Sequence, residues 1–231
     1  MQSIWLVELK PGLEKSVVET RENSSDIEGK LYQITYAKEA VKLGTAALGI
    51  KSKDTVVFSA IRKNPDDLSE HIEKIYKIDS HIFCTGSGLT ADINILINKL
   101  RSKCTSKNFV VQQNYGIKKL VQMLSEELQE NTMSISSRPS GCSLLIGGYD
   151  DVNGPQLFQT CPSSAFLNCK AMAVGERSQA ARTYLEDHLA EFPNCSRDKL
   201  IEHAIAALRS TVHSTKEFTE KVKFYFSIYF F

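Results

Sequence analysis

Residues 29–44 read Gly-Lys-Leu-Tyr-Gln-Ile-Thr-Tyr-Ala-Lys-Glu-Ala-Val-Lys-Leu-Gly, and they give the clearest secondary-structure signal of the chain. Neither glycine nor proline interrupts residues 31–43, and apolar side chains recur there at helical spacing, at Leu31, Ile34, Ala37 and Val41. This pattern predicts a helix over residues 31–43. The next two segments, 45–51 and 54–60, are rich in strand formers and are joined by a Lys-Ser-Lys-Asp turn, which predicts a β-hairpin.

Blocks of strands and blocks of helices follow this opening. Strands are expected at residues 72–78 and 81–85, the second ended by Gly86-Ser87-Gly88. Asp92 lies in the first turn of the next expected helix, where a carboxylate favours the helix dipole. In chain order we expect helices at 90–103 and 115–131, strands at 142–149, 156–161 and 165–174, helices at 178–191 and 196–212, and a last strand at 218–231.

This order of elements predicts the fold class. Separate blocks of strands and helices, rather than strict alternation, favour an α+β fold with mainly antiparallel sheets. Two sheets with a helix pair on each outer face form a four-layer αββα sandwich. No linker, low-complexity stretch or repeat of 20–50 residues interrupts the pattern, so we expect one domain.

The composition excludes several classes of protein. The 231 residues include 28 Lys+Arg and 27 Asp+Glu, so a net charge of +1 gives no bulk attraction to nucleic acid or membrane. No apolar run approaches the ~20 residues of a membrane span, and we expect no secretion signal. The six cysteines form no C-x-x-C pair, and no histidine lies at zinc-ligand spacing. We therefore expect free thiols in a reducing compartment, no metal site and no cofactor.

The helix and its neighbours also carry a family motif. Residues 29–37, with Glu-Ala-Val-Lys-Leu-Gly-Thr at 39–45, closely resemble the opening signature of proteasome α-type subunits. The run at 177–186, Arg-Ser-Gln-Ala-Ala-Arg-Thr-Tyr-Leu-Glu, is similar to the type-1 branch of that family. The resemblance covers about residues 26–213 and continues through Glu73-Lys74-Ile75, Gly88-Leu89-Thr90-Ala91-Asp92, Arg138-Pro139 and Leu144-Leu145-Ile146-Gly147-Gly148-Tyr149-Asp150.

The resemblance implies a fold and a role. The fold is the four-layer αββα sandwich of the N-terminal nucleophile hydrolases. The role is that of an α subunit of the 20S proteasome core, in ubiquitin-dependent protein degradation in the cytoplasm and nucleus. Seven different α subunits form each outer ring next to β rings, gate substrate entry and dock activators. The implied partners are therefore other α subunits, β-ring subunits and regulatory-particle activators, with no nucleic acid and no membrane.

The resemblance also assigns residues to an activator pocket. Lys74 matches a lysine that pairs with the terminal carboxylate of an activator tail, in a pocket between neighbouring α subunits. Gly44 and Leu31 match two further positions that line this pocket. Such a carboxylate needs a cation and backbone donors. The residues alone also fit a simpler interpretation, in which Lys74 is a solvated strand lysine.

Other positions match the gate and the ring contacts. Tyr36 matches a tyrosine of the cluster that holds the gate open, and Tyr32 and Gln33 belong to the same signature. Ile27 replaces the proline of that cluster. Residues 1–24 match no family N-terminus, so we divide the chain into an atypical tail, 1–24, and a single α-type domain, 25–231. The aromatic end of the chain, residues 223–231, departs from the family as well.

Thr45 bears on whether the chain is itself a protease. Catalytic subunits of this fold use an N-terminal threonine, whose hydroxyl is the nucleophile and whose free amine is the base. Thr45 follows 44 residues, so its nitrogen is an amide, and Ile61 stands near the position of the catalytic carboxylate. Ser178 matches a supporting serine, although the N-cap of its helix is a simpler role. We expect no catalytic residue; the alternatives are a β-type peptidase cleaved before Thr45 and an unrelated small-molecule binding domain.

Overall fold

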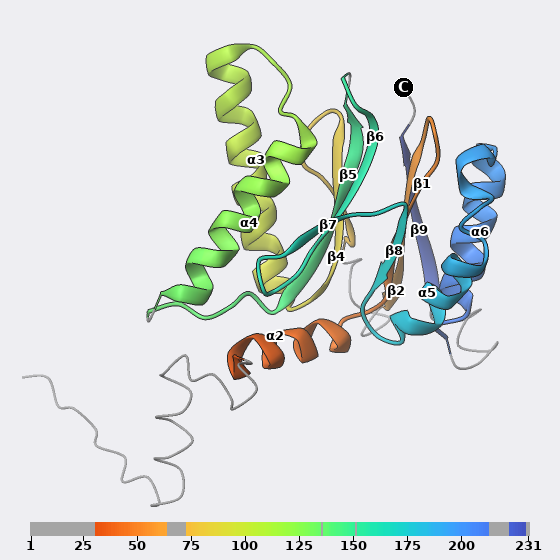
Figure 1. Ribbon diagram of the computed structural model, residues 1–231, viewed down its shortest axis with the longest axis horizontal. Coiled ribbons are helices and arrows are strands. Elements are labelled where there is room, and N and C mark those ends of the chain that lie inside the picture. The colour runs from red at the N-terminus through yellow and green to blue at the C-terminus, as the bar shows by residue number, and fades with distance from the viewer. Residues whose placement is uncertain (1–30, 64–72, 135, 151, 213–221, 230–231) are drawn as a thin grey trace, which may run out of the picture.

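Two antiparallel sheets with helices on their outer faces make up the part of the chain that the computed structural model describes, residues 31–63, 73–134, 136–150, 152–212 and 222–229 (Figure 1). The four-stranded sheet has the order β8-β1-β2-β9, with β1 Ala47–Lys51, β2 Val56–Lys63, β8 Ala171–Val174 and β9 Val222–Tyr229. The five-stranded sheet has the order β3-β4-β5-β6-β7, with β3 Ile75–Lys77, β4 Ile82–Gly88, β5 Cys142–Asp150, β6 Gly154–Thr160 and β7 Phe166–Asn168.

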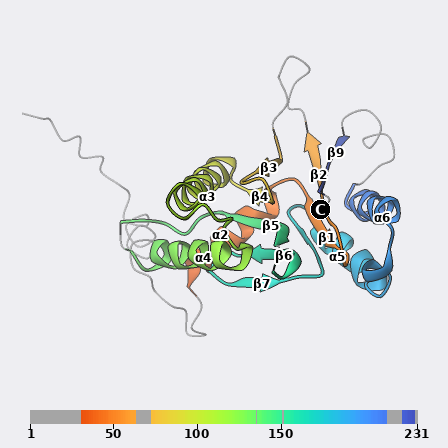
Figure 2. The same ribbon diagram turned by 90° about the horizontal axis from the view of Figure 1, so that it is seen from above.

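The helices cover the outer faces of the sheets in pairs. Helices α3 (Thr90–Val111) and α4 (Ile117–Met133) pack on the five-stranded sheet. Helices α5 (Ser178–Asp187) and α6 (Arg197–Arg209), joined through a 3-10 turn, η1 (Phe192–Asn194), pack on the four-stranded sheet. Figure 2 shows the four layers in order, helix pair, sheet, sheet, helix pair. The predicted α+β sandwich is confirmed.

The period of two along each strand explains why the sheets can pack on both faces. In β2, Val57 and Ile61 face the α5–α6 pair, whereas Phe58 and Ala60 face the other sheet. In β5, Leu144 and Ile146 face α3 and α4, and Leu145 points between the sheets. Successive strand side chains point to opposite faces, so an apolar run in a doubly covered strand supplies two cores at once.

A short connection between β7 and β8 carries the chain from the five-stranded sheet back to the four-stranded sheet. Strand β7 ends at Asn168 in the five-stranded sheet, and β8 begins at Ala171 in the four-stranded sheet. Between them, the Cys169 N–H donates to the Leu157 oxygen of β6 at 2.8 Å. The next residue, Lys170, accepts at 2.8 Å from the N–H of Lys51 at the end of β1. Adjacent residues therefore bond to different sheets.

Several element boundaries differ from those expected. The single strand predicted at 165–174 is wrong, because the chain changes sheets inside it. Strand β4 continues through the glycines that were expected to end it, since Gly86 and Gly88 stay paired with β5. Helix α3 runs eight residues beyond the expected Lys103, to Val111, because no helix breaker follows and Cys104 continues its buried face. The predicted helix at 178–191 instead ends at Asp187.

Candidate functional site

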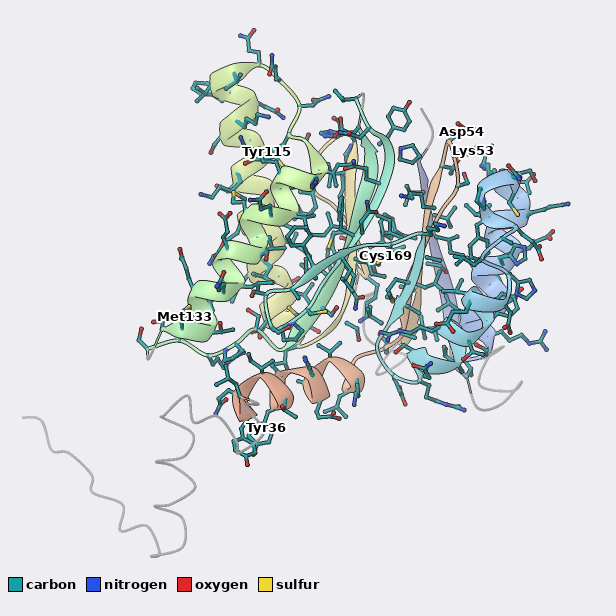
Figure 3. The ribbon with its side chains drawn as sticks, in the orientation of Figure 1. Tyr36, Lys53, Asp54, Tyr115, Met133 and Cys169 are labelled. Carbon is teal, nitrogen blue, oxygen red and sulfur yellow. The ribbon has the colours of Figure 1, made fainter. Side chains whose placement is uncertain are left out.

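Helix α2, Tyr32–Leu43, lies across one end of the sandwich, opposite the turn at Lys53 and Asp54 (Figures 1 and 3). Its inner face buries Ala37 and Val41 and contacts β4 and β5. The predicted helix over residues 31–43 is thus confirmed, with Leu31 as its N-cap residue. The helix closes this end of the sandwich and presents its other face outward.

Two of the predicted gate and ring residues, Tyr32 and Tyr36, lie on that outward face. Tyr36 is 58% exposed and points away from both sheets (Figure 3). Tyr32, one turn earlier, stacks on it with ring centroids 6.4 Å apart. Gln33 is partly buried on the same helix. Ile27 lies outside the described residues. The two tyrosines form a large, exposed aromatic surface of the kind that a partner chain can cover.

Gly44 ends α2 in a close three-way junction. A Cβ atom at Gly44 would lie 2.3 Å from both the Gly88 nitrogen and the Ser87 hydroxyl oxygen. The Ser87 hydroxyl donates to the Val41 carbonyl at 3.0 Å, which ties the helix end to β4. The turn after β8 also reaches this point, where the Glu176 N–H donates to the Gly44 oxygen at 2.7 Å. Only glycine fits at position 44 without displacing the end of β4.

Lys74 precedes β3, one of the two edge strands of the five-stranded sheet. Its carbonyl accepts from the Thr85 hydroxyl of β4 at 2.8 Å. Its side chain is only partly exposed, and burial lowers the pKa of its ammonium. Among residues 73–134 and the other described ranges, no carboxylate forms an ion pair with it. A cation that burial already disfavours gains from an anionic partner, so this environment suits a carboxylate ligand.

The structure brings two of the three predicted pocket residues near one another. Lys74 contacts Thr85 of β4, and Gly44 contacts Ser87 and Gly88 of the same strand. Ser87 and Gly88 follow Thr85 by two and three residues. At about 3.4 Å per strand residue, these contact points are about 7–10 Å apart. Leu31 lies at the other end of α2, about 20 Å from Gly44 at 1.5 Å per helical residue. One copy of the chain therefore does not bring all three into a single pocket.

Thr45 lies between α2 and β1, with its nitrogen in the peptide bond to Gly44. Ile61 is its near neighbour, because the Ile61 N–H donates to the Ala46 oxygen at 2.9 Å. Ile61 is 5% exposed and belongs to the core under α5 and α6. The Thr45 hydroxyl is buried, with no hydrogen-bond partner in the part of the chain that the structure describes. Here Thr45 offers no free amine, and position 61 offers no carboxylate.

Ser178 does not have the capping role predicted for it. The N-cap of α5 is Arg177, which adopts a left-handed conformation with φ 52°, and Ser178 is the first helical residue. The residue before this turn, Gly175, has φ +103°, and a Cβ there would lie 2.7 Å from the Thr45 oxygen. The turn at residues 175–178 thus packs on the start of β1. This packing, rather than a serine cap, determines how α5 begins.

Sequence reasoning missed one polar centre near this end of the sandwich. Asp92, in the first turn of α3, accepts both terminal N–H groups of Arg138 at 2.7 Å. It also accepts the N–H of Gly141 at 2.8 Å, and these bonds lower the pKa of its carboxyl group. Asp92 and Arg138 both fall in segments of the family resemblance, which was the available signal. The centre fixes the start of α3 against the loop that precedes β5.

The described residues give no sign of a membrane span or a metal centre. No helix among them is both long and apolar enough to span a bilayer. Within the same ranges, no group of three or more His, Cys, Asp or Glu side chains is arranged to hold a metal ion. The six cysteines are free thiols.

Comparison with known proteins gives a consistent result. The profile of a family described as "Proteasome subunit" matches residues 41–225. A Drosophila melanogaster protein named "Proteasome subunit alpha type-1" is 42% identical over 190 residues, 82% of this chain and 68% of the relative. A Dictyostelium discoideum protein of the same name is 39% identical over 82% of this chain and 76% of its own. A Schizosaccharomyces pombe "Probable proteasome subunit alpha type-6" is 37% identical over 84% and 71%.

Proposed function

Because the chain belongs to the proteasome α-subunit family, we propose that it is a non-catalytic subunit of the outer ring of the 20S core, where it helps to gate substrate entry and to dock activators. The observation that carries this proposal is helix α2, which is joined through Gly44 to Thr45 and closes the end of the sandwich. A catalytic subunit needs that end open and Thr45 as its first residue.

The alternative, a β-type peptidase released by cleavage before Thr45, fits the structure poorly. Cleavage would remove Gly44 and α2, and with them the Ser87–Val41 bond and the buried Ala37 and Val41. It would also leave Ile61 where catalysis needs a carboxylate. The matched relatives are named α subunits, which does not favour the β-type alternative.

The absence of catalysis has a direct test. Purified full-length chain should give no turnover of fluorogenic peptides and no adduct at Thr45 with a threonine-directed electrophile. The adduct would be located by peptide mass spectrometry, with an assembled core particle as the positive control. Stoichiometric labelling of Thr45, together with a mature N-terminus at that residue, would overturn the non-catalytic assignment.

Assembly supplies the second test. A closed ring of different subunits requires two unlike flanks on each chain, and the exposed Tyr32–Tyr36 surface of α2 is suited to one of them. Native mass spectrometry of the endogenous particle should find this chain twice per core, beside other α subunits and β subunits. Tagged chain should sediment with that particle in cytoplasmic and nuclear extracts. Recovery only as a free monomer would count against the proposal.

The activator pocket is the third part of the proposal. Lys74 would pair with the terminal carboxylate of an activator tail, with Gly44 beside it and Leu31 reaching a different pocket or the far side of the same one. The partly buried ammonium, which has no carboxylate partner among the described residues, supports this role. The separation of Leu31 from Gly44 fits a pocket shared between two neighbouring subunits, since one chain cannot supply all three positions at one point.

A further inference from the structure

A groove of about 660 Å³ lies between α2, the end of β6 and the start of α5. In the part of the chain that the structure describes, four basic residues and no acidic residue line it. Lys38 and Lys42 come from α2, and Arg177 and Arg182 come from the start of α5. The remaining wall is largely apolar, formed by Val41, Pro162, Leu167, Met172 and Val174. The groove thus combines positive charge on two sides with an apolar surface between them.

The positive charges of the groove are mostly unneutralised. Lys42 pairs with Glu39 at 2.6 Å, but no carboxylate of the described residues forms an ion pair with Lys38, Arg177 or Arg182. The Nε of Arg182 donates to the Ala173 oxygen of β8 at 2.8 Å, which holds its guanidinium at the groove wall. Three cations therefore surround a partly enclosed space to which the described residues bring no counter-charge, and an anionic ligand would relieve their repulsion.

Cys161 lines the groove together with these charges. Its partly buried thiol lines the groove, and burial raises its pKa. Lys38 and Arg182 oppose that rise, since both favour the thiolate. Lys38 belongs to α2 and Arg182 to α5, so both helices contribute positive charge to the groove that Cys161 lines. The start of α5, which has no side-chain cap, adds the positive end of a helix dipole at Ser178 and Gln179.

We propose that this groove binds an acidic, partly apolar peptide segment of another polypeptide chain. Carboxylates of the segment pair with Lys38, Arg177 and Arg182, and its apolar side chains cover the surface that includes Val41 and Leu167. An inorganic anion would leave that apolar surface in water, and the volume lies in the range of sites for much larger ligands. The site does not include Lys74, Gly44 or Leu31, so it is distinct from the activator pocket.

The test uses the full-length chain and a fluorescent peptide of sequence (Glu-Leu)3, with binding followed by anisotropy. We expect saturable binding that weakens as salt rises, because exposed charges are screened. The double variant Lys38→Glu/Arg177→Glu should lose about ten-fold or more in affinity. The matched control, Lys119→Glu/Lys199→Glu, makes the same change in net charge at exposed sites on α4 and α6, and should stay within about two-fold of wild type. Equal losses in both variants would overturn the proposal.

A second measurement needs no variant and locates the ligand. Alkylation of Cys161 should slow several-fold when the peptide is bound, whereas Cys195, which is also partly exposed but packs near the α5–α6 core, should react unchanged. The neutral peptide (Gln-Leu)3 should give no protection. Protection by tripolyphosphate as strong as that by the acidic peptide would show a small-anion site and would overturn the peptide assignment. Absence of protection by the acidic peptide would overturn the site itself.

Discussion

Removal of the Asp92 carboxylate should destabilise the chain by an amount that its contacts allow us to estimate. The side chain is 8% exposed and accepts the Gly141 N–H at 2.8 Å. Asp92→Ala leaves that buried N–H without a partner, which costs about 1–3 kcal/mol. The lost pair with Arg138 adds about 1 kcal/mol or less, because Arg138 is 62% exposed and remains solvated. We expect a total of about 1–4 kcal/mol.

Urea unfolding of the full chain, followed by circular dichroism, measures this cost. Arg138→Ala should cost less than Asp92→Ala, since it leaves the bond to Gly141 in place. Asp92→Asn should fall between wild type and Asp92→Ala, because its amide oxygen can still accept from Gly141. The double variant gives the coupling of Asp92 and Arg138, expected at about 1 kcal/mol. If Asp92→Ala costs no more than Arg138→Ala, the bond to Gly141 does not carry the stability and our reasoning fails.

The remaining predictions concern pH, the pocket, the junction and the thiols. The Arg138 bonds hold the pKa of Asp92 below its unfolded value. The ionised carboxylate therefore stabilises the folded chain fully above about pH 4–5, and this contribution is lost as pH falls through the folded pKa. The unfolding free energies of wild type and Asp92→Asn should converge in acid. Lys74→Ala in reconstituted core particles should weaken binding of the activator-tail peptide by about 2 kcal/mol, the low end for an enclosed ion pair. The exposed control Lys77→Ala should change this binding little. Equal affinity of both variants would show that Lys74 is a solvated strand lysine. Gly44→Ala should destabilise the chain by about 3 kcal/mol or more in the urea assay, because its Cβ would lie 2.3 Å from the backbone of β4. A loss of unfolding free energy below about 1 kcal/mol would mean that the junction of α2 with β4 relaxes to accept the methyl group. Burial raises the pKa of Cys142 to about 12, so it should resist alkylation at pH 8 in the folded chain while partly exposed Cys161 reacts; equal rates in a mass-spectrometric time course would contradict the burial.

The elements with a clear side-chain period could be predicted from the sequence. Helix α2 was expected from four apolar positions, and the structure places its boundary within one residue. The β1–β2 hairpin follows from two strand-forming runs and a polar turn. These signals are local, because burying one face of a helix or strand imposes its period on the sequence directly.

Features that depend on distant partners could not be predicted in this way. Residues 165–174 look like one strand, because both parts are extended and nothing in their composition marks the change of sheet at Cys169. The glycines of β4 look like a terminator, yet they continue the strand because β5 approaches closely and a Cβ at Gly86 would lie 2.9 Å from the Ser143 oxygen. Tertiary contact overrides local preference at both places.

In the candidate site too, the sequence predicts some residues, and others come together only on folding. The family resemblance identified Lys74 and Gly44, and the structure then supplied the contacts with Thr85 and Ser87 that place both residues beside one strand, β4. The resemblance could not reveal the groove between α2 and α5, since its four cations come from segments about 135–145 residues apart in the chain. A charge cluster of this kind exists only after folding and leaves no short motif.

The connection between β7 and β8 has a consequence for how the molecule opens. Cys169 is bonded to β6 and Lys170 to β1, so a single peptide link joins the hydrogen-bond networks of both sheets. The sheets are about 10 Å apart, and three residue steps span at most about 10 Å. The connection therefore has almost no slack, and the sheets cannot slide or separate while both of its bonds persist. Amide protons at the edges of the two sheets should exchange with solvent as one cooperative unit.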